Sequence, residues 1–363
     1  MSGGNVSDVH VSGQGTPRTS PAPQPRRAIT RTDVARYAGV SSAVVSYVLN
    51  GGPKPVAAAT RLRVLDAIAL LGYRPNAAAR ALSRGVADMI GMIVPDSRNP
   101  YFAELVHAVD RAAQQHGRTL LVINSDSRRS ATSDHIAGLA SHQLDGLIVA
   151  DTLSAAERSS VTSLGVPVVL VNQFSGDKNV AAFGVDYYGG ARSGVEHLIE
   201  HGHERIAFIG GDPAIDQRER GWMDALAAAG LPLGQRYRVG FSLASGYRAG
   251  TQLSEDPKRP TAAFVASDQL AFSAVSAIHE HGLRVPEDVA VVSFDGSAES
   301  MYVWPPLTTV AQPVERMAAA ALSRLLSGAT DAVFEAYPTH LIVRRSCGCE
   351  FEPTRARAAG TSS

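Results

Sequence analysis

The strongest constraint on the fold is a regular alternation of apolar and amphipathic segments between residues 89 and 344. Strands are expected at 89–94, 119–123, 146–150, 167–171, 205–210, 262–266, 289–294 and 340–344. Helices are expected at 102–116, 132–143, 188–200, 216–229, 270–281 and 314–326. This alternation predicts parallel sheets covered by helices on both faces. Because about 250 residues exceed one comfortable sheet, we expect two α/β subdomains with a cleft between them, and ligands beyond the carboxyl ends of the strands.

Residues 31–50, RTDVARYAGVSSAVVSYVLN, show a different pattern, that of two short helices joined by a tight turn. Gly39 stands where the turn needs a positive φ, and Ser41 can cap the second helix. That helix has an apolar stripe formed by Val44, Val45, Val48 and Leu49. The pattern is typical of a helix-turn-helix, whose second helix enters the DNA major groove, although an ordinary helical hairpin has the same pattern.

Two further helical segments follow this unit. Residues 60–71 predict a third helix that ends at Gly72 and has no strong N-cap, because Ala57 stands where Ser is expected. Its packing residues are expected to be Leu62, Leu65, Ile68 and Leu71. Residues 75–82 are rich in alanine and have only Leu82 to bury, so this short segment should be helical only when something holds it.

Charge is distributed unevenly, although the formal net charge of the 363 residues is zero. Residues 26–84 hold ten basic and two acidic side chains, which gives +8, and residues 85–363 therefore carry −8. A small basic module on an acidic body favours nucleic-acid binding by the first part and not by the second.

Neither a metal site nor a catalytic site is predicted. Cys347 and Cys349 are too few for a disulfide framework, which fits a reducing compartment, and they supply only two of the four ligands of a structural zinc site. His197 and His201 share a helical face but lack the glutamate of a zinc-protease motif. No dinucleotide fingerprint and no nucleophile–base arrangement stands out, so no cofactor is expected. Without a transmembrane-length apolar run or a signal sequence, we expect a cytosolic protein with no membrane partner.

Several stretches, in this order, resemble the lactose/galactose-repressor family of bacterial transcription regulators. They are DVARYAGVSSAVVSYVLN, TRLRVLDAIALLGYRPNAAARAL, NPYF, HLIEHGHERIAFIGG, GLRVPEDVAVVSFDG and PPLTTVAQP. The resemblance runs from about Ile29 to Arg345. It implies a small all-α helix-turn-helix DNA-binding head and a hinge helix, followed by an α/β periplasmic-binding-protein-like core of two parallel-sheet subdomains.

The first 27 residues are rich in Gly, Ser, Pro and Gln, which predicts a disordered tail. For the rest of the chain, the resemblance implies boundaries and an assembly. The expected parts are a disordered tail (1–27), the head (28–74), the hinge helix (75–86), the two-lobed effector-binding and dimerisation core (87–345) and a flexible tail (346–363). The family binds double-stranded, pseudo-palindromic operator DNA as a homodimer or as a dimer of dimers. The residues after Arg345 show no leucine heptad, which favours the dimer.

For the head, the resemblance assigns roles to individual residues. Phosphate contacts are expected from Thr32, Ser41 and Asn50, and base contacts from Ser42, Ala43, Val44, Ser46 and Tyr47. In the hinge, Leu82 would enter the minor groove, Ala79 would pack on its twofold mate, and Asn76 would also lie at the DNA. Ser42, Ala43 and Tyr47 depart from the family's usual choices, which predicts a different operator sequence.

For the core, the family's effector positions carry over to Tyr101, Phe102, Asn172, Arg218, Phe241, Asp268 and Asp295. An arginine with acidic partners and aromatic faces suits a polyhydroxylated small molecule such as a sugar, although Arg218 and Asp295 could also be a structural ion pair. Ser267 stands where the family commonly has Asn.

The expected function is that of a transcription regulator, a repressor, whose operator affinity is set by a small molecule that either induces or corepresses. The alternative is a solute-binding protein of a transport system, which would share the core fold but would need export. An enzyme is not expected.

Overall fold

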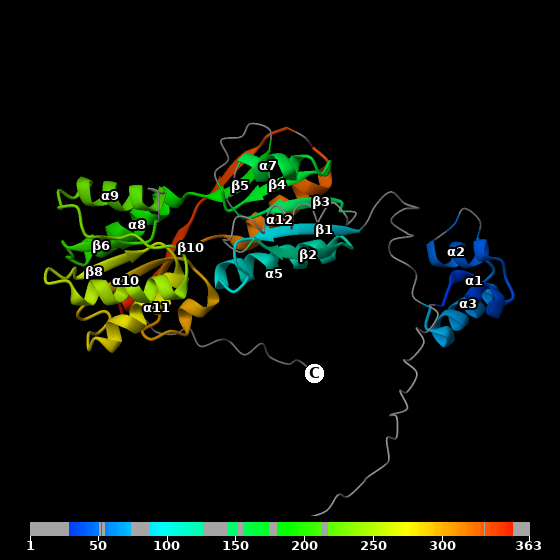
Figure 1. Ribbon diagram of the computed structural model, residues 1–363, viewed down its shortest axis with the longest axis horizontal. Helices are drawn as coiled ribbons and strands as arrows, with labels where there is room; N and C mark the ends of the chain where they lie inside the picture. Colours follow the sequence, from blue (N-terminus) through cyan, green and yellow to red (C-terminus); the bar gives the residue numbers. More distant parts are fainter. Residues whose placement is uncertain are drawn as a thin grey trace, which may run out of the picture. The chain divides into compact units, whose positions relative to one another are not determined.

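The computed structural model describes residues 29–50, 52, 55–73, 88–125, 144–151, 155–173, 180–211, 217–329 and 331–350 (Figure 1). The chain divides into two compact units, Met1–Ala79 and Arg80–Ser363. The predicted hinge helix, the predicted helix at 132–143, the N-terminal tail and residues 351–363 lie outside the described residues, so these expectations stay predictions. No described helix is long and apolar enough to cross a membrane.

In its described residues, the first unit contains three helices, α1 (Arg31–Ala38), α2 (Ser42–Asn50) and α3 (Ala58–Leu71). The predicted turn is confirmed. Gly39 has a φ of 65°, and the Ser41 hydroxyl accepts a hydrogen bond from the Val44 N–H at 3.3 Å. Helix α1 is capped by Thr30, whose N–H donates to the Asp33 carboxylate at 2.9 Å while its hydroxyl accepts from the Asp33 N–H, a capping box.

Helix α3 buries a different face from the one predicted. Val64 and Ala67 are fully buried, whereas Leu62 and Leu65 are 62% and 42% exposed, so the prediction for these two leucines was wrong. Ile68 and Leu71 are half-buried against the head core, as expected. The physical reason is helix geometry: Val64, Ala67, Ile68 and Leu71 follow the i, i+3, i+4, i+7 spacing of one helical face, which packs in the head core, and Leu62 and Leu65 lie off that face.

The second unit contains two six-stranded sheets with matching strand orders. The first is ordered β2-β1-β3-β4-β5-β11, and its neighbouring strands are all parallel. The second is ordered β7-β6-β8-β9-β10-β12 and is parallel except for β12, which runs antiparallel to β10. The prediction of two parallel-sheet subdomains is therefore confirmed. The strands are β1 (Met89–Val94), β2 (Thr119–Asn124), β3 (Gly146–Val149), β4 (Val168–Val171), β5 (Ala181–Val185), β6 (Ile206–Ile209), β7 (Arg236–Tyr237), β8 (Ala262–Val265), β9 (Ala290–Asp295), β10 (Thr308–Ala311), β11 (Phe334–Tyr337) and β12 (His340–Ile342).

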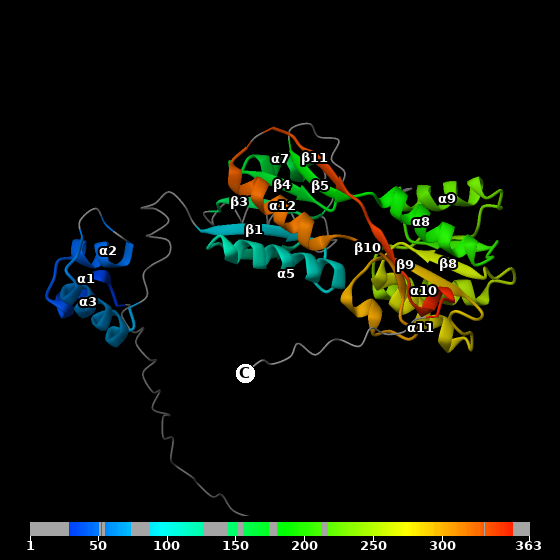
Figure 2. The same cartoon turned by 180° about the vertical axis from the view of Figure 1, so that it is seen from behind.

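Helices cover both faces of each sheet (Figures 1 and 2). In the first lobe, α5 (Pro100–Gln115) and α12 (Val314–Ser327) pack together on one face, and α7 (Ala155–Thr162) places Val161 in the apolar cluster of the other. In the second lobe, α8 (Tyr187–Glu200) and α9 (Gln217–Ala228) cover one face, and α10 (Leu243–Glu255) and α11 (Asp268–Glu280) cover the other.

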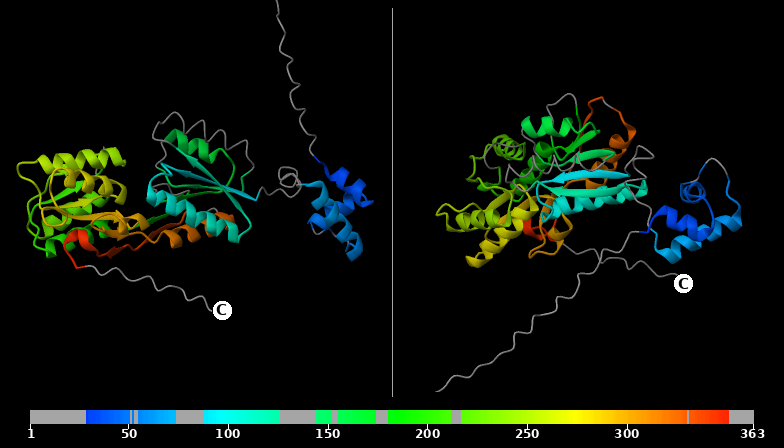
Figure 3. Two further views of the ribbon diagram at one scale, coloured as in Figure 1. Left: turned by 90° about the horizontal axis from the view of Figure 1, so that it is seen from below. Right: turned by 45° about the vertical axis from the view of Figure 1, so that its right-hand side comes forward.

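The chain passes between the lobes three times in the described residues, from β5 to α8, from β10 to α12 and from β11 to β12 (Figure 3). Each lobe is therefore assembled from separate chain segments. Two short 3-10 helices, Ala298–Met301 and Arg345–Cys347, complete the second lobe.

Helix α8 has three glycines, and two of them, Gly190 and Gly194, let it lie close to the second sheet. A Cβ at Gly194 would lie 2.9 Å from the Phe264 ring, and a Cβ at Gly190 would lie 2.5 Å from the Thr339 hydroxyl. Real Cβ atoms do not approach neighbours this closely, so larger residues at these two positions would push the helix away from the second sheet.

The missing N-cap of α3 gives a stability prediction. Ala57 makes no side-chain cap hydrogen bond, so Ala57→Ser should stabilise α3 by about 0.5–1 kcal/mol. Hydrogen exchange of peptides from Ala58–Leu71, measured by mass spectrometry in the full chain, should slow by about two- to five-fold. Ala69→Ser, in the exposed interior of the same helix, is the control and should not slow exchange. Equal exchange in wild type and Ala57→Ser would contradict the prediction.

Candidate functional site

A cavity of about 540 Å³ lies where the carboxyl ends of both sheets meet. Pro95, Ala150 and Asn172 reach it directly after strands of the first sheet. Ser267, Asp295 and Gln312 reach it from corresponding strand ends of the second sheet. The cavity is therefore built by both lobes, at the place where open parallel sheets bind ligands.

Arg218 is held in the cavity among aromatic rings. Its guanidinium carbon lies 5.0 Å from the ring centre of Phe241, 5.2 Å from that of Tyr187 and 5.7 Å from that of Phe294. One of its nitrogens, Nη1, donates to the backbone oxygen of Ala266 at 2.8 Å. These contacts fix a positive charge over aromatic faces, where cation–π attraction is strongest once water is excluded.

Asp295 ends strand β9 in a strained conformation, with a φ of 120°. Its carboxylate accepts hydrogen bonds from the Asp268 N–H at 3.3 Å and from the Gln312 side-chain amide at 3.0 Å. Burial, reinforced by the negative charge of Asp268, raises the pKa of Asp295 well above the usual carboxyl value, and Arg218 opposes this only in part. Positive φ in a non-glycine residue is costly and is found most often at functional sites.

Asn172 organises the wall of the cavity on the first lobe. It has a φ of 62°, and its side-chain oxygen accepts a hydrogen bond from the Tyr101 hydroxyl at 2.8 Å. The Tyr187 hydroxyl donates to the same side-chain oxygen. Tyr101 is positioned in turn by Asn99, which caps α5 and accepts from the Tyr101 N–H at 3.1 Å.

Of the seven predicted effector residues, the structure brings together all but Asp268 at the cavity wall: Tyr101, Phe102, Asn172, Arg218, Phe241 and Asp295. Asp268 lies behind the wall. One carboxylate oxygen accepts from the Ser293 and Thr309 hydroxyls at 2.6 and 2.7 Å, and the other from the Ser297 N–H and hydroxyl at 2.7 and 2.8 Å. Its carboxylate is thereby saturated within the second lobe.

Sequence reasoning missed several lining residues, namely Asp151, Gln173, Tyr187, Gln217, Arg220 and Gln312. Asp151 and Gln173 follow predicted strands closely, so their position was a usable signal. Gln312 follows β10, which was not predicted. Its side-chain oxygen is buried and has no hydrogen-bond partner among the described residues.

The head presents one face of α2 to the outside. Val45 and Val48 are buried in the head core, Ala43 is exposed, and Ser42, Val44, Ser46 and Tyr47 are half-buried. Thr32 and Ser41 are exposed near the start of each helix. The Asn50 side chain, Asn76, Ala79 and Leu82 lie outside what the structure describes.

The Tyr47 ring lies directly against the backbone of Gly52. A Cβ at Gly52 would lie 2.1 Å from the Tyr47 ring, so only glycine fits beside it. The Gly52 N–H also donates to the Tyr47 backbone oxygen at 3.3 Å. This contact orients the largest side chain among the predicted base-contacting residues.

Comparison with known proteins agrees with this geometry. Residues 30–76 match the model of bacterial regulatory proteins of the lacI family, and residues 195–347 match a periplasmic binding protein-like domain. Catabolite control protein A from Priestia megaterium is 34% identical over 306 residues, which cover 82% of this chain and 92% of that protein.

Two solved structures are similar to this chain over most of its length. The lac repressor dimer bound to operator and the anti-inducer ONPF aligns with a TM-score of 0.77 at 30% identity, covering 88% of this chain and 99% of that one. The complex of the transcriptional regulator CelR with cellobiose aligns with a TM-score of 0.66 at 30% identity, covering 88% and 99%. From the head, the two-lobed core and these matches, the chain belongs to the lacI family of bacterial regulatory proteins, and it is a DNA-binding transcription regulator with a ligand-binding core.

Proposed function

We propose that the chain acts in the cytoplasm as a homodimeric repressor, and that its cavity takes a sugar or a related polyhydroxylated small molecule which changes its affinity for operator DNA. The observation that carries this proposal is the cavity at the carboxyl ends of both sheets, where Arg218 is held over aromatic rings and Asp295 is buried nearby. It is not proposed to be an enzyme, because its relatives are regulators.

The lining chemistry supports a polyhydroxylated ligand. Phe102 and Phe241 offer apolar faces for the C–H side of a sugar ring, while Arg218 and Asp295 offer a charged donor and a charged or protonated acceptor. The Gln312 oxygen, which lacks a partner among the described residues, can accept a hydrogen bond from a ligand hydroxyl. The cavity volume of about 540 Å³ is in the range of sites that bind small molecules such as sugars.

Coupling to DNA follows from where the cavity lies. A ligand that touches both lobes binds one arrangement of the lobes more tightly than another, and it therefore shifts the population between them. If the two arrangements differ in how they hold the heads of a dimer, operator affinity changes by the same coupling free energy. The sign of that change separates an inducer from a corepressor.

DNA binding distinguishes this proposal from a solute-binding protein for transport. Operators selected from a random DNA pool by the full chain should be pseudo-palindromic, as expected for two α2 helices related by a dimer axis. Fluorescence anisotropy should show affinity falling by about 10³-fold between 50 and 200 mM salt, as for about six neutralised phosphates. Retention of sugar binding with no DNA binding at low salt would support the transport alternative instead.

A charge placed on α2 tests the DNA-contacting face. Ala43→Asp should weaken operator binding by at least about tenfold, because the new carboxylate would face phosphates, while an acidic residue near a helix start does not disturb folding. Ala69→Asp places the same charge on an exposed alanine of α3 and should leave affinity nearly unchanged. Anisotropy titrations of both variants make the comparison, and equal losses would argue against α2 as the reading helix.

Asp295→Asn tests the role of this carboxyl in the cavity and the loss of folding stability caused by its ionisation when buried. For the wild type, the folded pKa of Asp295 lies above the unfolded one, so stability falls as pH rises from the unfolded pKa towards the folded pKa, by at most about 1.4 kcal/mol per pH unit. The asparagine of the variant does not ionise, so the variant does not lose stability in this way. Its melting temperature relative to wild type should therefore be higher at pH 8 than at pH 5, while its ligand affinity falls.

Asp288→Asn is the matched control, since hydrogen bonding from the Arg284 N–H lowers the pKa of this surface carboxyl. Its removal should give no gain at pH 8. Scanning calorimetry at both pH values and titration calorimetry with a sugar panel give the two readouts. If the melting temperature of Asp295→Asn rose by the same amount at both pH values, the destabilisation could not come from ionisation of the buried carboxyl.

A further inference from the structure

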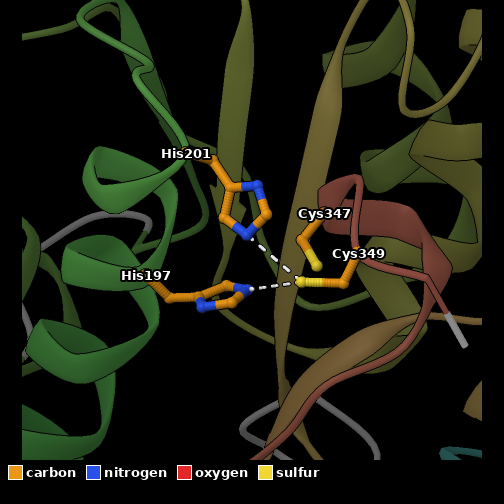
Figure 4. Close-up of side chains that lie close together, drawn as sticks. All are labelled: His197, His201, Cys347 and Cys349. Atoms are coloured by element: carbon orange, nitrogen blue, oxygen red, sulfur yellow. Dashed lines mark hydrogen bonds between the residues drawn. The ribbon is translucent and has the colours of Figure 1, made fainter.

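Four side chains of metal-ligating type lie together at one end of helix α8, away from the effector cavity (Figure 4). His197 is in the last turn of α8, and His201 is its C-cap. Cys347 ends the last short 3-10 helix, and Cys349 follows two residues later. The ligand atoms of all four lie within 4.8 Å of one another, although the pairs are separated by about 150 positions in the sequence.

We propose that His197, His201, Cys347 and Cys349 bind one zinc ion in a tetrahedral site. Zinc in proteins is bound at about 2.3 Å by sulfur and about 2.0 Å by nitrogen, so neighbouring ligand atoms of a tetrahedron lie about 3.3–3.8 Å apart. The Cys349 sulfur lies 3.2 Å from His201 Nε2 and 3.7 Å from His197 Nε2. Two edges of the site are thus already close to the required length.

Local structure directs both pairs toward one point. His197 and His201 are four residues apart and so share a helical face. Between the cysteines, Gly348 has a φ of 98°, which lets the chain turn and brings the second sulfur back beside the first. Both thiols are free rather than joined in a disulfide.

The surroundings also favour a bound cation. The Cys347 sulfur is buried and accepts a hydrogen bond from the Thr308 hydroxyl at 3.0 Å, which would stabilise a thiolate. The carboxyl end of α8 points its partial negative charge toward the site. On binding, both thiols would lose their protons to solvent, and the two imidazoles would coordinate in the neutral form through Nε2.

Two nitrogens and two sulfurs are the ligand set of closed structural zinc sites, with no open position for substrate. The ion would join the chain segment that follows β12 to α8, the helix that Gly190 and Gly194 seat close to the same sheet. The ion would stabilise the second lobe by cross-linking these two parts of it. This role is independent of ligand binding in the cavity and of DNA binding by the head.

The experiment uses the full chain, purified under reducing conditions without an oligohistidine tag. Elemental analysis by mass spectrometry should find about one zinc per chain, and thermal melting should shift to lower temperature after removal of the ion by a chelator and recover when zinc is returned. Cobalt substituted for zinc should give the visible bands of a tetrahedral ion and a thiolate charge-transfer band, which report both the geometry and the sulfur ligands.

His201→Gln and Cys349→Ser should each lose most of the bound zinc. After cobalt substitution, the thiolate charge-transfer band of Cys349→Ser should be nearly absent. His281→Gln is the matched control, because His281 is the exposed C-cap of α11 before a positive-φ glycine, as His201 is in α8, but it has no cysteine nearby. Zinc content below a tenth of an equivalent in wild type, or the same content in Cys349→Ser and wild type, would overturn the proposal. Because cobalt spectra are read on the wild-type chain, the test stands even if a variant misfolds.

Discussion

The second lobe depends on one buried carboxylate, that of Asp268. Its four hydrogen bonds join the start of α11 to strand β9, to the turn after β9 and to strand β10. A buried charge without such partners would cost several kcal/mol, so these elements are held in one arrangement. The Asp268 N–H then donates to Asp295 and holds it at the cavity in its strained conformation. The wall of the cavity therefore depends on a carboxylate that is not among the lining residues.

Most of the fold could be predicted from the sequence, because strands buried on both faces read as continuous apolar runs. Four short strands escaped prediction, namely β5, β7, β10 and β11. Strand β10 carries Thr308 and Thr309, whose hydroxyls are used by Cys347 and Asp268. Helix α10 was not predicted because its glycines break the helical pattern. Only the packing against α11 explains these glycines, since a Cβ at Gly246 or Gly250 would clash with the backbone of α11.

The cavity was predictable wherever a residue follows a strand with a clear apolar signal, as Asn172 and Asp295 do. It was not predictable where tertiary pairing decides: Asp268 directly follows a cavity-lining residue, yet its carboxylate is turned into the lobe. The proposed zinc site shows the same limit. Each pair of ligands looked incomplete alone, and only the fold brings the CGC segment beside α8. For α3, spacing identified a helix, but its buried face is set by Val64 and Ala67, which pack in the head core, rather than by the larger Leu62 and Leu65.

The three passages of the chain between the lobes bear on how the protein is made. Helix α12 and strand β11 belong to the first lobe but follow every parallel strand of the second. During synthesis, the first sheet therefore stays incomplete until most of the second lobe has left the ribosome. Until then, one edge of β5 is unpaired and one helical layer lacks α12. The lobes cannot mature one after the other. A protease that cuts a single passage would likewise not separate the lobes, because at least one of the two fragments still spans both of them.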